Sequence, residues 1–178
     1  MGRFLLGVVV TLLVLAAAGL VVVFTGGYDV AATSPHTQPV YWALDTTRVN
    51  AIHRMAADVR APGGLTDEQA RRGYKTYSEA CVYCHGAPGA DPEPWSAGML
   101  PEPPYMPDVA KNWSDGEIFW IVKHGIKMSG MPAFKLSDEQ IWDVVAFVRR
   151  IPDMSEDAYK AYGEAPAGGG GAGAAPQR

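Results

Sequence analysis

Cysteine occurs at only two positions in this chain, and both lie in the pentapeptide C-V-Y-C-H at residues 81–85. A C-x-x-C-H spacing is typical of c-type haem attachment. On a tight helical turn the two thiols can each add across one vinyl group of the porphyrin, and the next residue can present its imidazole to the iron. The pattern therefore predicts one covalently attached haem c, with Cys81 and Cys84 as thioethers and His85 as an axial ligand.

Two other kinds of site use a C-x-x-C pair, a zinc half-site and a thioredoxin-like redox centre. Zinc needs two further Cys or His ligands at a recognisable spacing, and His36, His53 and His124 do not supply it. A redox pair would accompany a strand–helix–strand pattern, and the sequence contains none. Haem attachment is favoured over both.

The second axial position of the iron has three candidate ligands, Met131, Met128 and His124. A thioether ligand raises the reduction potential of the haem. Met131 precedes Pro132, and a proline restricts the preceding residue to extended conformations. The loop is therefore expected to hold the Met131 side chain toward the iron, whereas nothing constrains Met128. The sequence predicts His85/Met131 ligation.

Three capping boxes of the form S/T-x-x-E/Q, in which cap and third residue satisfy each other's amides, mark helix starts. They begin at Thr66, Ser114 and Ser137 and predict helices over about 67–80, 115–124 and 138–150. The first helix would deliver its C-terminal end to the C-x-x-C-H motif. Between the first two helices, residues 86–112 hold seven prolines and three glycines and predict a loop able to wrap a cofactor.

Together these features resemble the class I cytochrome c family. The resemblance rests on C-x-x-C-H at the end of a first helix, M-P-A-F (131–134) about fifty residues later, and a final amphipathic helix. It covers residues 66–152 and implies an all-α fold of three main helices around a covalent haem. It also implies that the first and last helices cross at Gly73, where Tyr77 packs against an aromatic residue of the last helix, Phe147 or Trp142.

The same resemblance implies a hydrogen bond behind the iron ligand. In this family the proximal histidine usually donates its other ring N–H to a proline carbonyl in the following loop. Pro101, Pro103 and Pro104 are the possible acceptors, and spacing does not choose among them. Such a bond would fix the ring and increase the basicity of the ligand.

An apolar run from Phe4 to Phe24 precedes all of this. As a helix it would span about 31 Å at ~1.5 Å per residue, close to the ~30 Å core of a bilayer. A signal peptide has an apolar region of only about 7–15 residues, so an uncleaved single-pass anchor over residues 4–24 is favoured. Arg3, on the short side of this run, favours an N-terminus in the cytoplasm. The haem domain would then face the periplasm from a bacterial inner membrane, which agrees with haem attachment outside the cytoplasm.

The remaining boundaries follow from composition. Residues 1–27 form the anchor, 28–64 a linker with an amphipathic helix at about 40–59, and 65–162 the cytochrome domain. Residues 163–178 are rich in Gly, Ala and Pro and are predicted to be disordered. The helix at 40–59 is either a spacer or a surface that packs on the domain, the membrane or a partner.

Charge is unevenly distributed along the chain. Residues 61–178 hold 11 Lys and Arg against 16 Asp and Glu, whereas residues 1–60 hold 4 against 3. An acidic domain without basic runs has no general attraction for nucleic acid, and none is expected as a partner. Four lysines around the distal loop could still form a positive rim for docking or simply be solvated surface; they are Lys111, Lys123, Lys127 and Lys135.

The sequence thus predicts a membrane-anchored monohaem electron carrier rather than an enzyme, with membrane-bound redox proteins as its donor and acceptor. Two alternatives remain open at this point. The chain could be an integral subunit of a quinol-oxidising, oxidase or dehydrogenase complex, with the haem as a fixed relay. It could also be a small haem enzyme or gas sensor in which the Met131 bond opens.

Overall fold

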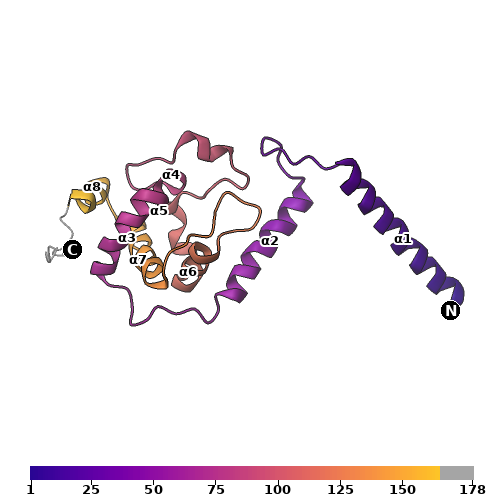
Figure 1. The fold of residues 1–178 in the computed structure, drawn as a ribbon, viewed down its shortest axis with the longest axis horizontal. Helices are drawn as coiled ribbons and strands as arrows, with labels where there is room; N and C mark the ends of the chain where they lie inside the picture. The colour runs from indigo at the N-terminus through magenta and orange to yellow at the C-terminus, as the bar shows by residue number, and fades with distance from the viewer. Residues whose placement is uncertain (165–178) are drawn as a thin grey trace. The chain divides into compact units, whose positions relative to one another are not determined.

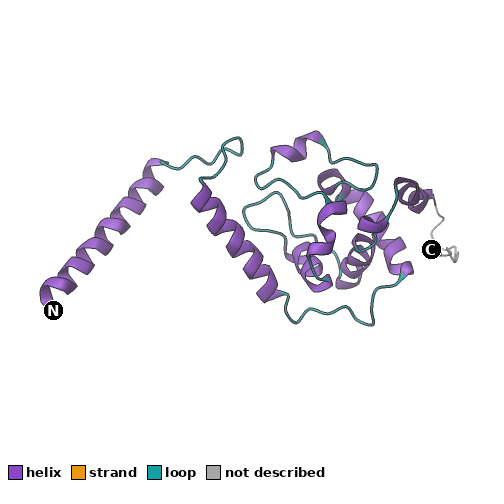
Figure 2. Cartoon of the chain, turned by 180° about the vertical axis from the view of Figure 1, so that it is seen from behind, coloured by secondary structure: helices purple, strands orange, loops and turns teal. Residues whose placement is uncertain are grey.

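The structure is a computed structural model that describes residues 1–164. Over those residues every regular element is helical, and only an isolated bridge joins Ala87 to Ala90. The described residues divide into two compact units, residues 1–36 and the residues from 37 onward. Figures 1 and 2 show the course of the helices in each unit. The all-α prediction is confirmed.

The first unit consists of helix α1, Gly2–Thr25, and the segment that follows it. Gly26 ends α1 in the left-handed conformation, with φ of 66°. The hydroxyls of Thr11 and Thr25 donate to the carbonyl oxygens of Gly7 and Val21, at 2.9 and 2.6 Å. The helix is long and apolar enough to cross a membrane. The two threonine hydroxyls are thus satisfied within the helix, as a lipid environment requires.

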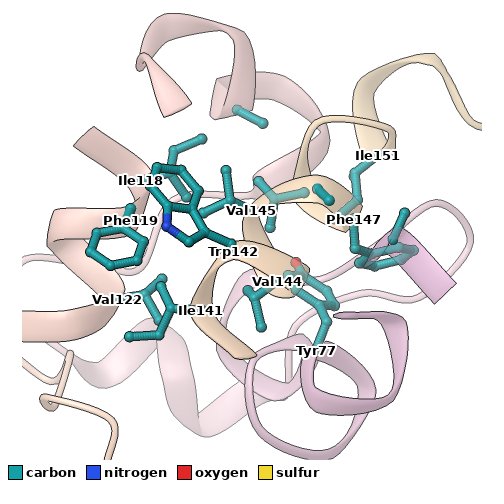
Figure 3. Packing of buried hydrophobic residues seen from close by; sticks show 14 of the residues in the cluster. Tyr77, Ile118, Phe119, Val122, Ile141, Trp142, Val144, Val145, Phe147 and Ile151 are labelled. Atoms are coloured by element: carbon teal, nitrogen blue, oxygen red, sulfur yellow. The ribbon is translucent and has the colours of Figure 1, made fainter. Parts of the chain in front are cut away.

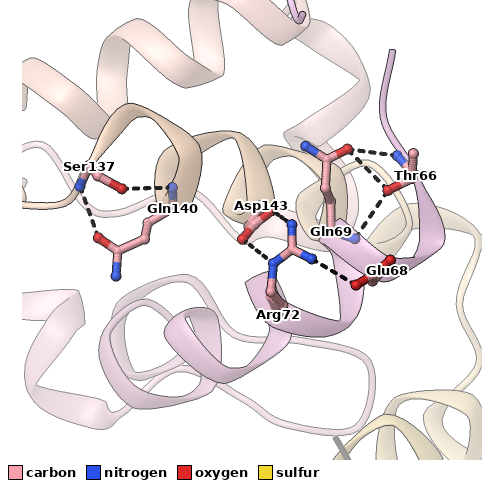
Figure 4. Close-up of polar contacts among 7 residues, drawn as sticks. All are labelled: Thr66, Glu68, Gln69, Arg72, Ser137, Gln140 and Asp143. Atoms are coloured by element: carbon pink, nitrogen blue, oxygen red, sulfur yellow. Dashed lines mark hydrogen bonds and ion pairs between the residues drawn. The ribbon is translucent and has the colours of Figure 1, made fainter. Parts of the chain in front are cut away.

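The second unit contains the remaining helices, and its three principal ones begin where the capping boxes predict. They are α3 (Asp67–Ala80), α6 (Asp115–His124) and α7 (Asp138–Val148), and each has both hydrogen bonds of its capping box. Figure 4 shows two of these boxes, at Thr66 and Ser137. Helix α7 ends at Val148, two residues earlier than predicted. The other elements are α2 (Gln38–Met55), α4 (Val82–His85), η1 (Pro94–Gly98), α5 (Met106–Val109), η2 (Ala110–Asn112), η3 (Ile151–Asp153) and α8 (Glu156–Glu164).

Helices α3 and α7 cross at very close range. A Cβ on Gly73 would lie 1.9 Å from the carbonyl oxygen of Asp143, so only glycine fits there. At this crossing Arg72 donates two hydrogen bonds of 2.8 Å to the buried Asp143 carboxylate (Figure 4). The ion pair therefore compensates the cost of burying a carboxylate.

Helix α7 forms the centre of the hydrophobic core. Every residue from Ile141 to Val148 is buried. Figure 3 shows that side chains from α3 and α6 pack around it. This explains why α7 reads as almost uniformly apolar in its second half: it is covered on more than one side.

Helix α2 packs on α6 within the second unit, which differs from a free spacer. Ile52 and Ala56 are buried, and a Cβ on Gly116 of α6 would lie 2.3 Å from the carbonyl oxygen of Val59. The His53 ring hydrogen-bonds the Glu117 carboxylate of α6. The segment assigned to the linker is therefore part of the compact unit from residue 37 onward.

The C-terminal end also extends the domain further than predicted. Helix α8 continues through Gly163 and Glu164. Its Tyr159 and Tyr162 rings lie 5.6 and 5.9 Å from the ring of Tyr74 on α3. The rest of the predicted disordered tail, residues 165–178, lies outside the described residues.

Candidate haem-attachment site

The C-x-x-C-H motif forms a tight turn at the end of α3. The amide of Cys81 donates to the Tyr77 carbonyl at 2.8 Å and closes α3. The amides of Cys84 and His85 both donate to the Cys81 carbonyl, at 3.1 and 3.0 Å. One carbonyl therefore organises the whole motif, and the two cysteines lie three residues apart on one helical turn, as attachment to two vinyl groups requires.

Both thiols lie in surroundings that disfavour ionisation. Burial raises the pKa of Cys81 to about 12 and also raises the pKa of Cys84. Reactive or metal-binding cysteines need the opposite shift, because the thiolate is the nucleophile and the ligand. Among residues 1–164, moreover, no group of three or more His, Cys, Asp or Glu side chains is arranged to hold a metal ion. The geometry thus suits thioether formation better than a redox pair or a zinc site.

The His85 ring is fixed by the loop that follows the motif. Its Nδ1 lies 2.9 Å from the carbonyl oxygen of Pro104. A carbonyl can only accept, so Nδ1 carries the proton and Nε2 keeps its lone pair for a metal. Burial lowers the pKa of His85, which favours this neutral form. Of the three candidate prolines, Pro104 is the one that accepts this bond; Pro101 and Pro103 do not.

Two tyrosine hydroxyls hold the first residues of that loop. Tyr77 donates to the Gly86 carbonyl at 2.6 Å, and Tyr105 donates to the Ala87 carbonyl at 3.0 Å. A Cβ on Gly86 would lie 2.4 Å from the Tyr105 ring, and its φ of 60° also favours glycine. Sequence reasoning missed Tyr105, and no spacing rule marks it, because its partner is set by how the loop folds back.

Met131 lies in a loop closed by hydrogen bonds. The Ile126 amide donates to the Met131 carbonyl at 3.0 Å, and the Met131 amide donates to Ser129 Oγ at 3.1 Å. The partly buried Met131 side chain packs against the hydrophobic core. Gly125 is required here because a Cβ would lie 2.6 Å from the backbone of Pro132 and Ala133. These contacts restrain Met131 within the loop, and its role as an iron ligand stays a prediction.

The two other candidates for the sixth ligand lie in different surroundings. Met128 has φ of 60° and is 94% exposed. The exposed His124 ring lies tilted against the ring of Trp120 at a centroid distance of 4.9 Å. Neither side chain packs against the core as Met131 does, which favours Met131.

The aromatic contact at the helix crossing involves Phe147. The rings of Tyr77 and Phe147 lie 5.3 Å apart. Trp142 instead stacks on Phe119 of α6 at 4.3 Å. The two residues are five positions apart on α7, so they cover different faces of the helix, and only packing reveals which face meets α3.

The four lysines of the possible docking rim have different partners. Lys123 and Lys111 form ion pairs of 2.6 Å with Asp138 and Asp153. Lys127 and Lys135 are exposed on the distal loop and just after it. Pairing leaves the first two less able to attract an acidic partner, a feature that spacing alone does not reveal.

A helical domain with a C-x-x-C-H turn, a histidine oriented by a proline carbonyl and a methionine loop defines a class I monohaem c-type cytochrome domain. Residues 68–148 match the family described as cytochrome C oxidase, cbb3-type, subunit III, so this part of the chain is similar to that family. No curated protein matches the chain. The chemistry of the residues present fits one covalently bound haem c.

Proposed function

We propose that the protein is a membrane-anchored monohaem cytochrome that transfers single electrons between redox partners on the periplasmic side of a bacterial inner membrane. The observation that supports the proposal most directly is the orientation of His85, which follows the C-x-x-C turn. His85 is oriented through Pro104 with Nε2 left for a metal, and Met131 is restrained by the 126–131 loop. The anchor is α1, which is compatible with a single membrane crossing.

When bound, the haem supplies reversible one-electron chemistry. The residues around it decide whether this chemistry serves electron transfer or catalysis at the iron. With His85 and Met131 both bound, the iron would have no open position for oxygen, peroxide or nitrite. The hydrogen bonds that hold His85 and Met131 need not change with oxidation state, which keeps reorganisation small. These features support outer-sphere electron transfer rather than catalysis at the iron, in line with a thioether ligand that raises the potential.

The docking surface for the partners is proposed to include Lys127 and Lys135. Both are exposed, whereas the other two lysines already have carboxylate partners. Redox encounters are small and transient, and charge mainly raises their association rate. Two lysines therefore suffice to orient an acidic partner without strong binding.

A second candidate is a fixed electron relay within a larger membrane complex. The observation that favours it is the packing of α2 on α6, because a free carrier does not need a docked second helix. With α2 docked, the segment between α1 and α2 shrinks to residues 26–37. Deleting residues 1–27 separates the two functions. A mobile carrier would then still deliver electrons at high concentration, whereas a relay would fail at any concentration.

The ligand assignment is tested by Met131→Ala, with Met128→Ala as the matched control. Loss of the thioether should abolish the sulfur-to-iron charge-transfer band and lower the potential on the order of 0.2 V, within the ~0.8 V that axial ligands span. The control should change neither. A Met131→Ala protein with the wild-type spectrum and potential would contradict the assignment.

The gas-sensor alternative has its own measurement. The wild-type ferrous protein should not bind carbon monoxide, whereas Met131→Ala should bind it. Rapid binding to the wild type would show that the sixth position opens, and the electron-carrier proposal would then give way to ligand sensing.

A further inference from the structure

Helix α2 has two halves in different surroundings. Its C-terminal half is held on the haem-bearing domain by Ile52 and Ala56, which are 1% and 3% exposed. The His53 ring also lies 5.7 Å from Trp113, and the Arg48 guanidinium lies 5.9 Å from the same indole. This half has a partner within the unit, because α2 lies beside α6 (Figure 1).

The N-terminal half exposes three large side chains. Tyr41, Trp42 and Leu44 are 48%, 68% and 55% exposed. At 3.6 residues per turn, Tyr41 lies between Leu44 and Trp42, so the three side chains cover an arc of about 160° around the helix. We call these three residues the α2 patch. None of the three belongs to the haem-attachment motif or to the loop that holds Met131.

The charge around the patch suits a lipid boundary. Residues 38–44 contain no charged side chain. The next charge, Asp45, forms an ion pair of 2.6 Å with Arg48. Tyr and Trp concentrate at membrane–water interfaces because they have an apolar ring and a polar group. The patch combines both aromatic types with a leucine and no nearby uncompensated carboxylate.

The chain length keeps the patch close to a membrane. Helix α1 ends at Thr25 and α2 begins at Gln38, so twelve residues separate them. Fully extended, they span at most about 43 Å at ~3.6 Å per residue. If flexible, their root-mean-square span is about 20 Å. An anchor in the bilayer thus holds the patch at a high effective concentration toward that same surface.

We propose that the α2 patch inserts into the boundary between headgroups and acyl chains of the phospholipid bilayer that α1 crosses. Because α2 is packed on α6, this docking restricts the orientation of the haem domain relative to the membrane. The domain then presents a fixed face to partners instead of tumbling on its tether. The inference rests on the proposed anchor, but not on the identity of the redox partners.

The test uses the full-length holoprotein in nanodiscs that hold one copy each. Its native cysteines are consumed by the haem, so an introduced thiol can be labelled alone. Leu44→Cys reports on the patch, and Asn50→Cys, which is exposed elsewhere on α2, is the control. The measurement is the rate of reaction with a membrane-impermeant sulfonated maleimide, normalised to the chain in denaturant.

Docking should make the thiol at position 44 react at least ~10-fold more slowly than the one at position 50, equivalent to about 1.4 kcal/mol. Adding Tyr41→Ala and Trp42→Ala should remove the difference. In oriented multilayers, the electron paramagnetic resonance signal of the ferric haem should depend on the angle between the membrane and the magnetic field for the wild type. This dependence should be lost in the Tyr41→Ala/Trp42→Ala variant.

Equal rates at the two positions in discs would overturn the proposal. The proposal would also be overturned if the thiol at position 44 were protected only in vesicles that hold many copies, and not in single-copy discs. The α2 patch would then be covered by a second chain and not by lipid. Resistance to alkaline extraction tests the α1 anchor separately. If the protein stays in the membrane but the thiols at positions 44 and 50 react at equal rates, lipid docking alone is refuted. If alkaline extraction releases the protein, the α1 anchor and the docking proposal that rests on it are both refuted.

Discussion

Replacing Gly73 by alanine should destabilise the domain at the crossing of α3 and α7. The added Cβ would lie 1.9 Å from the Asp143 carbonyl oxygen and 2.9 Å from the Val144 amide nitrogen. Close carbon–oxygen contacts in proteins lie at about 3.3–3.6 Å. Helix α3 or α7 must therefore move by roughly 1.4 Å or more. Both obstacles are backbone atoms, so no side-chain rotation relieves the clash.

The size of the effect follows from two opposing contributions. Overpacking a close-packed core costs typically ~1–3 kcal/mol, and a backbone clash belongs at the upper end, about 3 kcal/mol. Alanine favours the helix over glycine by about 1 kcal/mol. The net loss is about 2 kcal/mol, which lowers the melting temperature of a domain this size by about 8 °C at ~4 °C per kcal/mol.

The assay is thermal unfolding of the holoprotein followed by far-ultraviolet circular dichroism. Gly98→Ala is the matched control, because nothing lies within 4 Å of its Cβ position, and it should change stability by less than about 0.5 kcal/mol. A Gly73→Ala protein that melts at the wild-type temperature would refute the close-crossing argument. A similar loss in Gly98→Ala would show that the effect is not specific to the crossing.

Two further substitutions test the contacts around the site and α2. Tyr77→Phe removes the donor to the Gly86 carbonyl, and chemical denaturation should show a loss of ~1–2 kcal/mol; an unchanged midpoint would mean that water replaces the hydroxyl. Burial favours a higher pKa for Glu117, but hydrogen bonds from Ser114 and His53 outweigh it and lower the pKa below 4.5. Its charged form is therefore the stabilising one, fully effective above pH ~4.5 and lost as the pH falls through the lowered pKa. The stability difference between wild type and Glu117→Gln should accordingly be constant near pH 6–7 and shrink in acid, and a difference that grows in acid would contradict the sign.

Local sequence determined much of this protein, because its strongest signals act over a few residues. The C-x-x-C-H motif needs only one turn of helix, and each capping box needs only four residues, so both the attachment turn and the starts of α3, α6 and α7 follow from the chain itself. The length of α1 follows likewise, since a bilayer-length apolar run needs no tertiary partner to be recognised.

Tertiary structure decided the features that depend on which surfaces meet. Spacing left three prolines as acceptors for His85, and the fold of the 86–104 loop selects Pro104. Periodicity likewise allowed Phe147 or Trp142 at the crossing, and only the docking of α3 distinguishes their faces.

The role of α2 was beyond the sequence for the same physical reason. An amphipathic pattern shows that a helix has an apolar face, but not what covers it. Ile52 is buried because Gly116 lets α6 approach the segment that follows α2, a contact between residues more than fifty positions apart. The sequence by itself determined the haem chemistry and the helices that carry it, whereas long-range packing decided which partners each helix face has and which face remains exposed.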